Sequence, residues 1–182
     1  MAPAEPNLLL MGLRGSGKST LGRAIAQREG RRFVDLDEVS ASFLSSDSVA
    51  EAWSRFGEPA FRAAEAQALA AALLDDGTVI ALGGGTPTAP GVAELIEHAK
   101  NKRRCVVAYL RCEPAELRSR LMGLDEAAMT NRPSLTGGHP LDEIESVFAA
   151  RDPLYRKLAS REIEGVRSID EALDRFAGWR GW

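Results

Sequence analysis

Short hydrophobic runs alternate along the chain with longer stretches in which hydrophobic residues recur at helical spacing. The short runs predict buried strands at residues 7–11, 32–35, 78–82 and 105–110, with a weaker strand at 162–164. The longer stretches predict helices at 18–29, 48–75, 113–122, 141–159 and 169–176. The second helix is interrupted at 57–59, because a proline fits the first turn of a helix better than its interior. Strands that are hydrophobic on both sides and alternate with helices predict a parallel sheet covered on both faces, hence an α/β fold of three layers.

The composition is that of an ordinary globular domain, and we expect residues 1–182 to form a single one. The 45% of hydrophobic residues exclude a disordered or fibrous chain. A net charge of −3 gives no chain-wide attraction to nucleic acid. No hydrophobic run is long enough to span a membrane, and the N-terminus lacks the pattern of a signal peptide. We therefore expect a cytoplasmic protein that binds neither nucleic acid nor membranes.

Two cysteines, Cys105 and Cys112, are too few for a disulfide framework. On one strand, a separation of seven positions should place them on opposite faces. We therefore expect buried, reduced thiols.

The segment GLRGSGKST at 12–20 matches the phosphate-binding pattern G-x-x-x-x-G-K-[ST] and lies between a predicted strand and a predicted helix. Glycines allow consecutive backbone N–H groups to surround a phosphate, and the helix directs its positive end at the same charge. A Rossmann dinucleotide site is disfavoured, because Lys18 stands where that pattern continues toward a third glycine. A purely structural glycine-rich turn is the alternative, which the strand–helix context disfavours. The predicted nucleotide-binding residues are Gly12, Gly15, Ser16, Gly17, Lys18, Ser19 and Thr20.

Two further segments follow predicted strands, where ligands bind in open parallel sheets. Asp35 and Asp37 would point in opposite directions in an extended chain, so one can orient Mg²⁺ while the other accepts a hydrogen bond from a substrate hydroxyl. The alternative is that one of them only caps the next helix. The three glycines at 83–85 predict a second place where the backbone comes close to another group. The alternative is that they only form a turn.

Three arginines are each weak evidence for a binding site when taken alone. Arg62 lies three positions before Glu65, so a local ion pair explains it equally well. Arg151 directly precedes the segment DPLY at 152–155, and Arg132 lies in residues 123–139, a polar stretch without periodicity. Loops of that length in compact domains are usually functional or mobile.

Together and in order, these motifs resemble the shikimate kinase family over nearly the whole chain. The matching segments are GLRGSGKST at 12–20, DLD at 35–37, FGEPAFRAAE at 56–65, LGGG at 82–85, NRP at 131–133 and RDPLY at 151–155. The resemblance implies a P-loop fold like that of nucleoside monophosphate kinases, with five parallel strands in the order 2-3-1-4-5. It also implies transfer of the ATP γ-phosphate to the 3-hydroxyl of shikimate, in the route to chorismate and the aromatic amino acids, by a monomer that needs Mg²⁺.

The resemblance also implies roles for individual residues. The expected catalytic residues are Lys18, Asp37 and Arg132. The expected acceptor-binding residues are Asp37, Arg62, Gly83, Gly84, Gly85, Arg132 and Arg151, with the acceptor region at about 36–65. Ser19 and Asp35 correspond to the magnesium environment, and Arg120 corresponds to an arginine that lies against adenine. Trp53 and Phe61 correspond to apolar walls around the acceptor ring, although plain core packing explains them as well.

This assignment makes physical sense for phosphoryl transfer to a polyol acid. Two arginines can form paired charge-assisted bonds with the acceptor carboxylate, and the reaction depends mainly on positioning and charge stabilisation. Residues 123–139 would then be a lid that excludes water. The chain departs from the family in SLTGG after Arg132-Pro133, and in Thr86, where a small apolar residue is common. Another small P-loop kinase, such as a gluconate kinase, and a catalytically silent sensor remain as alternatives.

Overall fold

The computed structural model describes residues 5–123, 141–165 and 168–177. A five-stranded parallel sheet forms the centre, in the order β2-β3-β1-β4-β5. The strands are β1 (Asn7–Met11), β2 (Phe33–Asp35), β3 (Val79–Ala81), β4 (Cys105–Arg111) and β5 (Arg161–Glu164). This order confirms the prediction.

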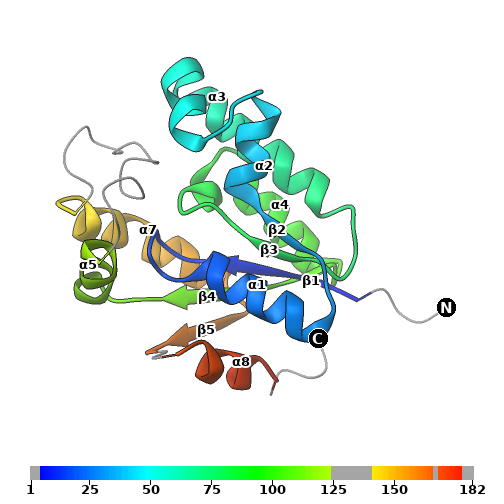
Figure 1. Cartoon of the computed structure of the whole chain (residues 1–182). Helices are drawn as coiled ribbons and strands as arrows, with labels where there is room; N and C mark the ends of the chain where they lie inside the picture. Colours follow the sequence, from blue (N-terminus) through cyan, green and yellow to red (C-terminus); the bar gives the residue numbers. More distant parts are fainter. Residues whose placement is uncertain (1–4, 124–140, 166–167, 178–182) are drawn as a thin grey trace.

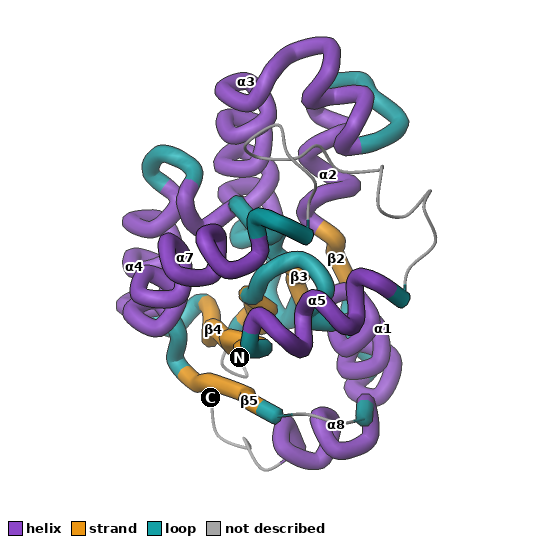
Figure 2. Tube along the Cα trace, turned by 90° about the vertical axis from the view of Figure 1, so that its left-hand side faces the viewer, coloured by secondary structure: helices purple, strands orange, loops and turns teal. Residues whose placement is uncertain are grey.

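Helices cover both faces of the sheet (Figures 1 and 2). The described helices are α1 (Lys18–Glu29), α2 (Leu36–Phe43), α3 (Val49–Ala72), the 3₁₀ helix η1 (Thr86–Thr88), α4 (Val92–Asn101), α5 (Pro114–Met122), α7 (Ile144–Leu158) and α8 (Ile169–Ala177). Alternate residues of β1 and of β4 belong to two different hydrophobic cores, as the two-residue period of a strand requires. Leu8 and Leu10 of β1 pack with α1 and α8, whereas Leu9 and Met11 pack in the core that contains α3, α4, α5 and α7.

The hydrophobic pattern located most of the elements. Strand 7–11 and helix 18–29 begin and end at the predicted residues, and the break in the long helix is confirmed at Gly57, whose φ is +77° inside α3. Helices α2 and α4 received no prediction. In α4, Val92, Ile96 and Ala99 are buried at helical spacing, so the signal was present. No helix within these described ranges has both the length and the apolar character that crossing a membrane requires.

The prediction for the two cysteines is partly wrong. Both thiols are free and buried, as expected. However, Cys105 and Cys112 belong to the same hydrophobic core and not to opposite faces. Strand β4 ends at Arg111, so the alternation of sides stops one residue before Cys112.

Candidate active site

The loop between β1 and α1 is shaped as a phosphate cradle. Gly15 and Gly17 have φ of +82° and +92°, a region that glycine enters without strain. A Cβ on Gly12 would lie 2.7 Å from the carbonyl oxygen of Leu110, so this position also has no room for a side chain. The buried ammonium of Lys18 donates to the carbonyls of Gly12 and Leu13, at 2.9 and 3.0 Å, and thereby closes the loop. The loop thus holds its backbone N–H groups and a positive charge around one small space.

Polar atoms at this loop fit a nucleotide and a divalent cation. Ser16 Oγ is the one buried side-chain polar atom without a hydrogen-bond partner in the described part of the chain, and such an atom favours a polar ligand. Ser19 Oγ donates to Asp35 Oδ2 at 2.7 Å. A hydroxyl beside a carboxylate is an oxygen donor set that suits Mg²⁺, which binds proteins through few such groups and completes its shell with phosphate and water. Thr20, the last of the predicted nucleotide-binding residues, lies exposed in the first turn of α1.

The predicted extended geometry of the two aspartates is wrong. Asp35 is the N-cap of α2 and accepts a hydrogen bond from the backbone N–H of Asp37, so the helix begins between them. The helical cap, which the sequence left as an alternative, therefore applies to Asp35. The two carboxylates still diverge: Asp35 contacts Ser19, whereas Asp37 faces a separate cavity.

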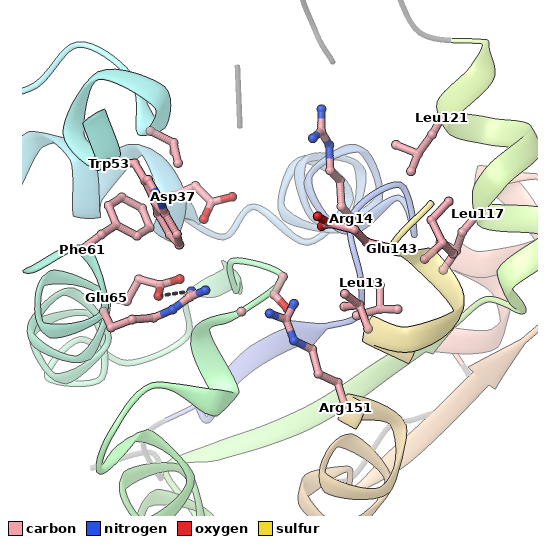
Figure 3. A pocket seen from close by; sticks show the side chains of 16 residues that line it. Leu13, Arg14, Asp37, Trp53, Phe61, Glu65, Leu117, Leu121, Glu143 and Arg151 are labelled. Carbon is pink, nitrogen blue, oxygen red and sulfur yellow. Dashed lines mark hydrogen bonds and ion pairs between the residues drawn. The ribbon is translucent and has the colours of Figure 1, made fainter. Parts of the chain in front are cut away.

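That cavity gathers most of the predicted acceptor-binding residues (Figure 3). Asp37 comes from α2, Arg62 from α3 and Arg151 from α7, and Arg14 of the phosphate loop completes the ring of polar groups. Trp53 and Phe61 lie on one side with ring centroids 5.6 Å apart. The remaining lining residues are Leu13, Val49, Glu65, Gly84, Gly85, Leu117, Leu121, Glu143, Ile144 and Val147. Residues more than 130 positions apart in sequence therefore surround a single space beside the phosphate loop.

The three glycines after β3 are required by close approach and not by backbone conformation, since none of them has a positive φ. A Cβ on Gly85 would overlap the Arg62 guanidinium, and a Cβ on Gly84 would lie 3.3 Å from the backbone nitrogen of Arg14. A Cβ on Gly83 would overlap the Asp37 carboxylate. Gly84 and Gly85 line the cavity, while Gly83 lies against the carboxylates of Asp37 and Glu65 and is not among the lining residues.

Arg62 is held by two carboxylates on its own helix. Its guanidinium donates to Glu65 Oε2 at 2.7 Å and to Glu58 Oε1 at 3.1 and 3.2 Å, and it lies 5.2 Å from the Trp53 ring. Burial lowers the pKa of Arg62, but the two carboxylates outweigh it and raise that pKa overall. Glu65 is only 1% exposed, and burial raises its pKa above the ordinary value in spite of Arg62. The local ion pair that the sequence suggested is therefore present, and it lies at the cavity.

Arg151 is fixed against the glycine loop. Its Nη1 donates to the carbonyl of Gly84 at 2.7 Å, and Tyr155 Oη donates to the same oxygen at 2.5 Å. Tyr155 is fully buried, and burial raises its pKa to about 12, so it is a neutral donor. Asp152, next to Arg151, accepts from Tyr109 Oη and Arg111 Nε at 2.8 and 2.9 Å. These bonds attach α7 to β4 and to the glycine loop.

A second cavity opens on the other side of the phosphate loop. Its residues include Ser16, Gly17 and Arg120, together with α8 residues Ile169 and Ala172. Arg120 lies close to the carbonyls of Gly15 and Ser16, at 3.4 and 3.3 Å, and pairs with Glu116 at 2.5 Å. The residue expected beside adenine is therefore next to the phosphate cradle.

Two expectations concern residues outside the described ranges, and some lining residues had not been predicted. Arg132, with almost all of the expected lid at 123–139, lies outside. Arg14 and Glu143 line the first cavity without having been singled out. For Arg14 the available signal was its place at a variable position of the phosphate loop; nothing in the local sequence marks Glu143.

Comparisons with known proteins agree on one family. The sequence model described as shikimate kinase matches residues 14–177. A shikimate kinase of Oleidesulfovibrio alaskensis is 40% identical over 160 residues, which cover 88% of each chain. A shikimate kinase of Mycobacterium tuberculosis is 37% identical over 171 residues, which cover 93% of this chain and 90% of the relative.

Solved structures give the same result. The shikimate kinase from Acinetobacter baumannii in complex with shikimate superposes with a TM-score of 0.80 and 29% identity, over 95% of this chain and 90% of that one. A gluconokinase from Sinorhizobium meliloti has a TM-score of 0.56 and 17% identity, over 95% of this chain and 92% of that one, which is a likeness of fold alone.

Proposed function

Since the chain belongs to the shikimate kinase family, we propose that it transfers the γ-phosphate of ATP to the 3-hydroxyl of shikimate and releases shikimate 3-phosphate and ADP. The observation that carries this proposal is the single cavity in which Asp37, Arg62 and Arg151 meet Arg14 of the phosphate loop. A small acid with several hydroxyls would be held there with its reactive oxygen facing the phosphates. The reaction belongs to the synthesis of chorismate and the aromatic amino acids.

The cavity suits each part of the acceptor. Arg62 and Arg151 would bind the carboxylate, because a guanidinium offers several donors in a fixed plane and the bond from Arg151 to Gly84 occupies only one of them. Asp37 would accept a hydrogen bond from a ring hydroxyl. The rings of Trp53 and Phe61 would cover the apolar face of the cyclohexene.

The phosphate loop would hold the nucleotide. The backbone N–H groups at 12–17 and the N-terminus of α1 would surround the phosphates, while Lys18 would exchange its two carbonyl partners for phosphate oxygens. Arg120 would lie against the adenine. Mg²⁺ near Ser19 and Asp35 would neutralise charge on the β- and γ-phosphates.

Proton removal from the acceptor falls to Asp37. Asp37 is 8% exposed as a residue and lines the cavity, so its carboxylate would orient the hydroxyl and accept its proton as the new bond forms. In a loose transition state little proton removal precedes bond formation, so positioning is the larger part of its contribution. Arg132 would add positive charge as residues 123–139 close over the site.

The decisive experiment is an ADP-release assay with Mg²⁺ and ATP on a panel of shikimate, quinate, gluconate and nucleoside monophosphates. We expect turnover with shikimate and a phosphate on its 3-hydroxyl by NMR. A Lys18→Met variant is the control for contaminating kinases. Activity on gluconate or a nucleotide but not on shikimate would refute the proposal. Shikimate binding without turnover would instead favour the silent sensor. We propose a cytoplasmic monomer, which sedimentation of the purified protein and fractionation of cells would test.

A further inference from the structure

Behind the acceptor cavity, a buried hydroxyl contacts a buried carboxylate. Thr86 is the first residue of η1 and has no exposed surface. Its Oγ1 lies 2.5 Å from Glu65 Oε1. An ionised carboxylate can only accept, so the hydroxyl is the donor in this bond.

The carboxylate of Glu65 connects Thr86 to Arg62 at the cavity. While Oε1 accepts from Thr86, Oε2 accepts from Arg62 Nη1 at 2.7 Å. The Arg62 side chain lines the acceptor cavity and is 12% exposed. A continuous chain of hydrogen bonds therefore runs from η1 through Glu65 to a guanidinium at the acceptor.

The surroundings of Glu65 act on its pKa in opposite directions. Burial raises its pKa, and the Asp37 carboxylate on α2 acts in the same direction. The Arg62 charge and the Thr86 hydroxyl act against them. From α7, Arg151 and Tyr155 are the other ionisable groups near this cluster. A protonated Glu65 would lose its charge attraction for Arg62, whose other carboxylate partner, Glu58, is 48% exposed and hence weaker.

The Thr86 hydroxyl does not cap its own helix, η1. The backbone N–H of Thr86 donates to Gly83 O at 3.1 Å, and η1 has no side-chain cap. In the same helix, by contrast, Thr88 Oγ1 donates to the carbonyl of Gly85. A Cβ on Gly83 would lie 2.7 Å from both Thr86 Oγ1 and Glu65 Oε1, so the absence of a side chain there leaves room for their contact.

We propose that Thr86 is a positioning residue for the acceptor: its hydroxyl orients Glu65, and Glu65 in turn holds the Arg62 guanidinium toward the acceptor carboxylate. The inference rests on the proposed function of this cavity. It predicts an effect on acceptor binding that is separate from any effect on the nucleotide, whose cradle is formed by other residues.

The test compares Thr86→Ala with Thr86→Ser, two variants that differ from each other only in the hydroxyl. We expect Thr86→Ala to raise the KM for shikimate by about tenfold, since a hydrogen bond to a charged group is lost, and to leave the KM for ATP unchanged. Thr86→Ser should stay within about twofold of the wild type, because its donor remains. Thr86→Val, which keeps the volume but not the donor, should behave like Thr86→Ala and serves if the alanine variant does not fold.

The pH profile gives a second readout. Without the Thr86 donor, the ionised form of Glu65 is less stable, so its pKa rises further. The acid limb of kcat/KM for shikimate should therefore move to higher pH, by about one unit, in the alanine and valine variants only. Ser40→Ala is the control: it removes a fully buried hydroxyl that donates to Leu36 O, and should lower the melting temperature without moving either KM.

A wild-type KM for shikimate in both Thr86→Ala and Thr86→Val would overturn the inference. So would equal impairment of Thr86→Ser, or a parallel rise in the KM for ATP, since each would indicate a structural role only. A wild-type protein without activity on shikimate would refute the proposed function itself, which keeps the two failures distinguishable.

Discussion

Adding one methyl group at Gly85 should displace the Arg62 guanidinium, which we propose binds the acceptor, without unfolding the protein. A Cβ at this position would lie 2.6 Å from Nη2 and 2.7 Å from Cζ of Arg62. Ordinary contacts between such atoms begin near 3.5 Å, so the guanidinium must retreat by about 1 Å. The backbone of Gly85, at φ −110° and ψ −11°, needs no change to accommodate alanine.

The cost should fall on catalysis more than on stability. The group that moves is the end of a flexible side chain, so we expect Gly85→Ala to change the free energy of unfolding by only about 1 kcal/mol. A misplacement of about 1 Å in a positioning group can cost about 10²-fold in rate, and the loss of a charge-assisted bond costs about 1.5–3 kcal/mol. We therefore expect kcat/KM for shikimate to fall about 10- to 100-fold.

Steady-state kinetics against shikimate and ATP, together with a melting curve, measure these quantities. The KM for ATP should not change, because the nucleotide cradle does not include Gly85. Ser40→Ala is the control for a change that affects stability alone, because it removes a fully buried hydroxyl that donates to Leu36 O and does not line the cavity. If Gly85→Ala kept the wild-type KM and kcat for shikimate, Arg62 could not be the acceptor-binding group that we describe.

Three other predictions test separate parts of the site and the core. Asp37→Asn keeps the shape of the side chain but not its charge, and should lower kcat by about 10²- to 10⁴-fold in the ADP-release assay; a wild-type kcat would exclude a base role. Arg132→Ala should lower kcat far more than it weakens shikimate binding measured by calorimetry, and equal turnover in mutant and wild type would contradict its role at the phosphates. Burial raises the pKa of Cys105 to about 11 from a usual value of 9.0, so its folded thiol stays neutral while the unfolded one ionises. The stability that this difference provides is present below pH 9 and is lost as pH rises to 11, so denaturant titrations should show a decline there that is smaller in Cys105→Ala; identical declines would show that Cys105 is not the cause.

The local sequence determined those parts of the protein whose signal lies within one segment. The hydrophobic run at 7–11, the glycine-rich turn and the amphipathic helix at 18–29 are all consequences of neighbouring residues, and the structure has them at the predicted positions. The phosphate cradle is contiguous, so its residues could be recognised before the fold was known. Helix α2 received no prediction, because its eight residues are too few for a clear period.

Tertiary structure decided how the proposed acceptor cavity is assembled. Arg14, Asp37, Arg62 and Arg151 come from separate elements, and the strand order brings the ends of β1, β2 and β3 to one edge of the sheet. Motif resemblance named three of these four, but residue spacing alone could not show that they share a space. Local reasoning also placed Asp35 and Asp37 on an extended chain, although a helix begins between them.

The hydrogen bonds behind the cavity were likewise decided by the tertiary structure. Thr86 meets Glu65 across 21 positions, and Tyr155 meets Gly84 across 71. Periodicity reports which face of an element is apolar, but it carries no information about which buried polar atoms will meet across elements. Burial then sets the energetic importance of such contacts, since a polar group removed from water must find its partner within the folded chain.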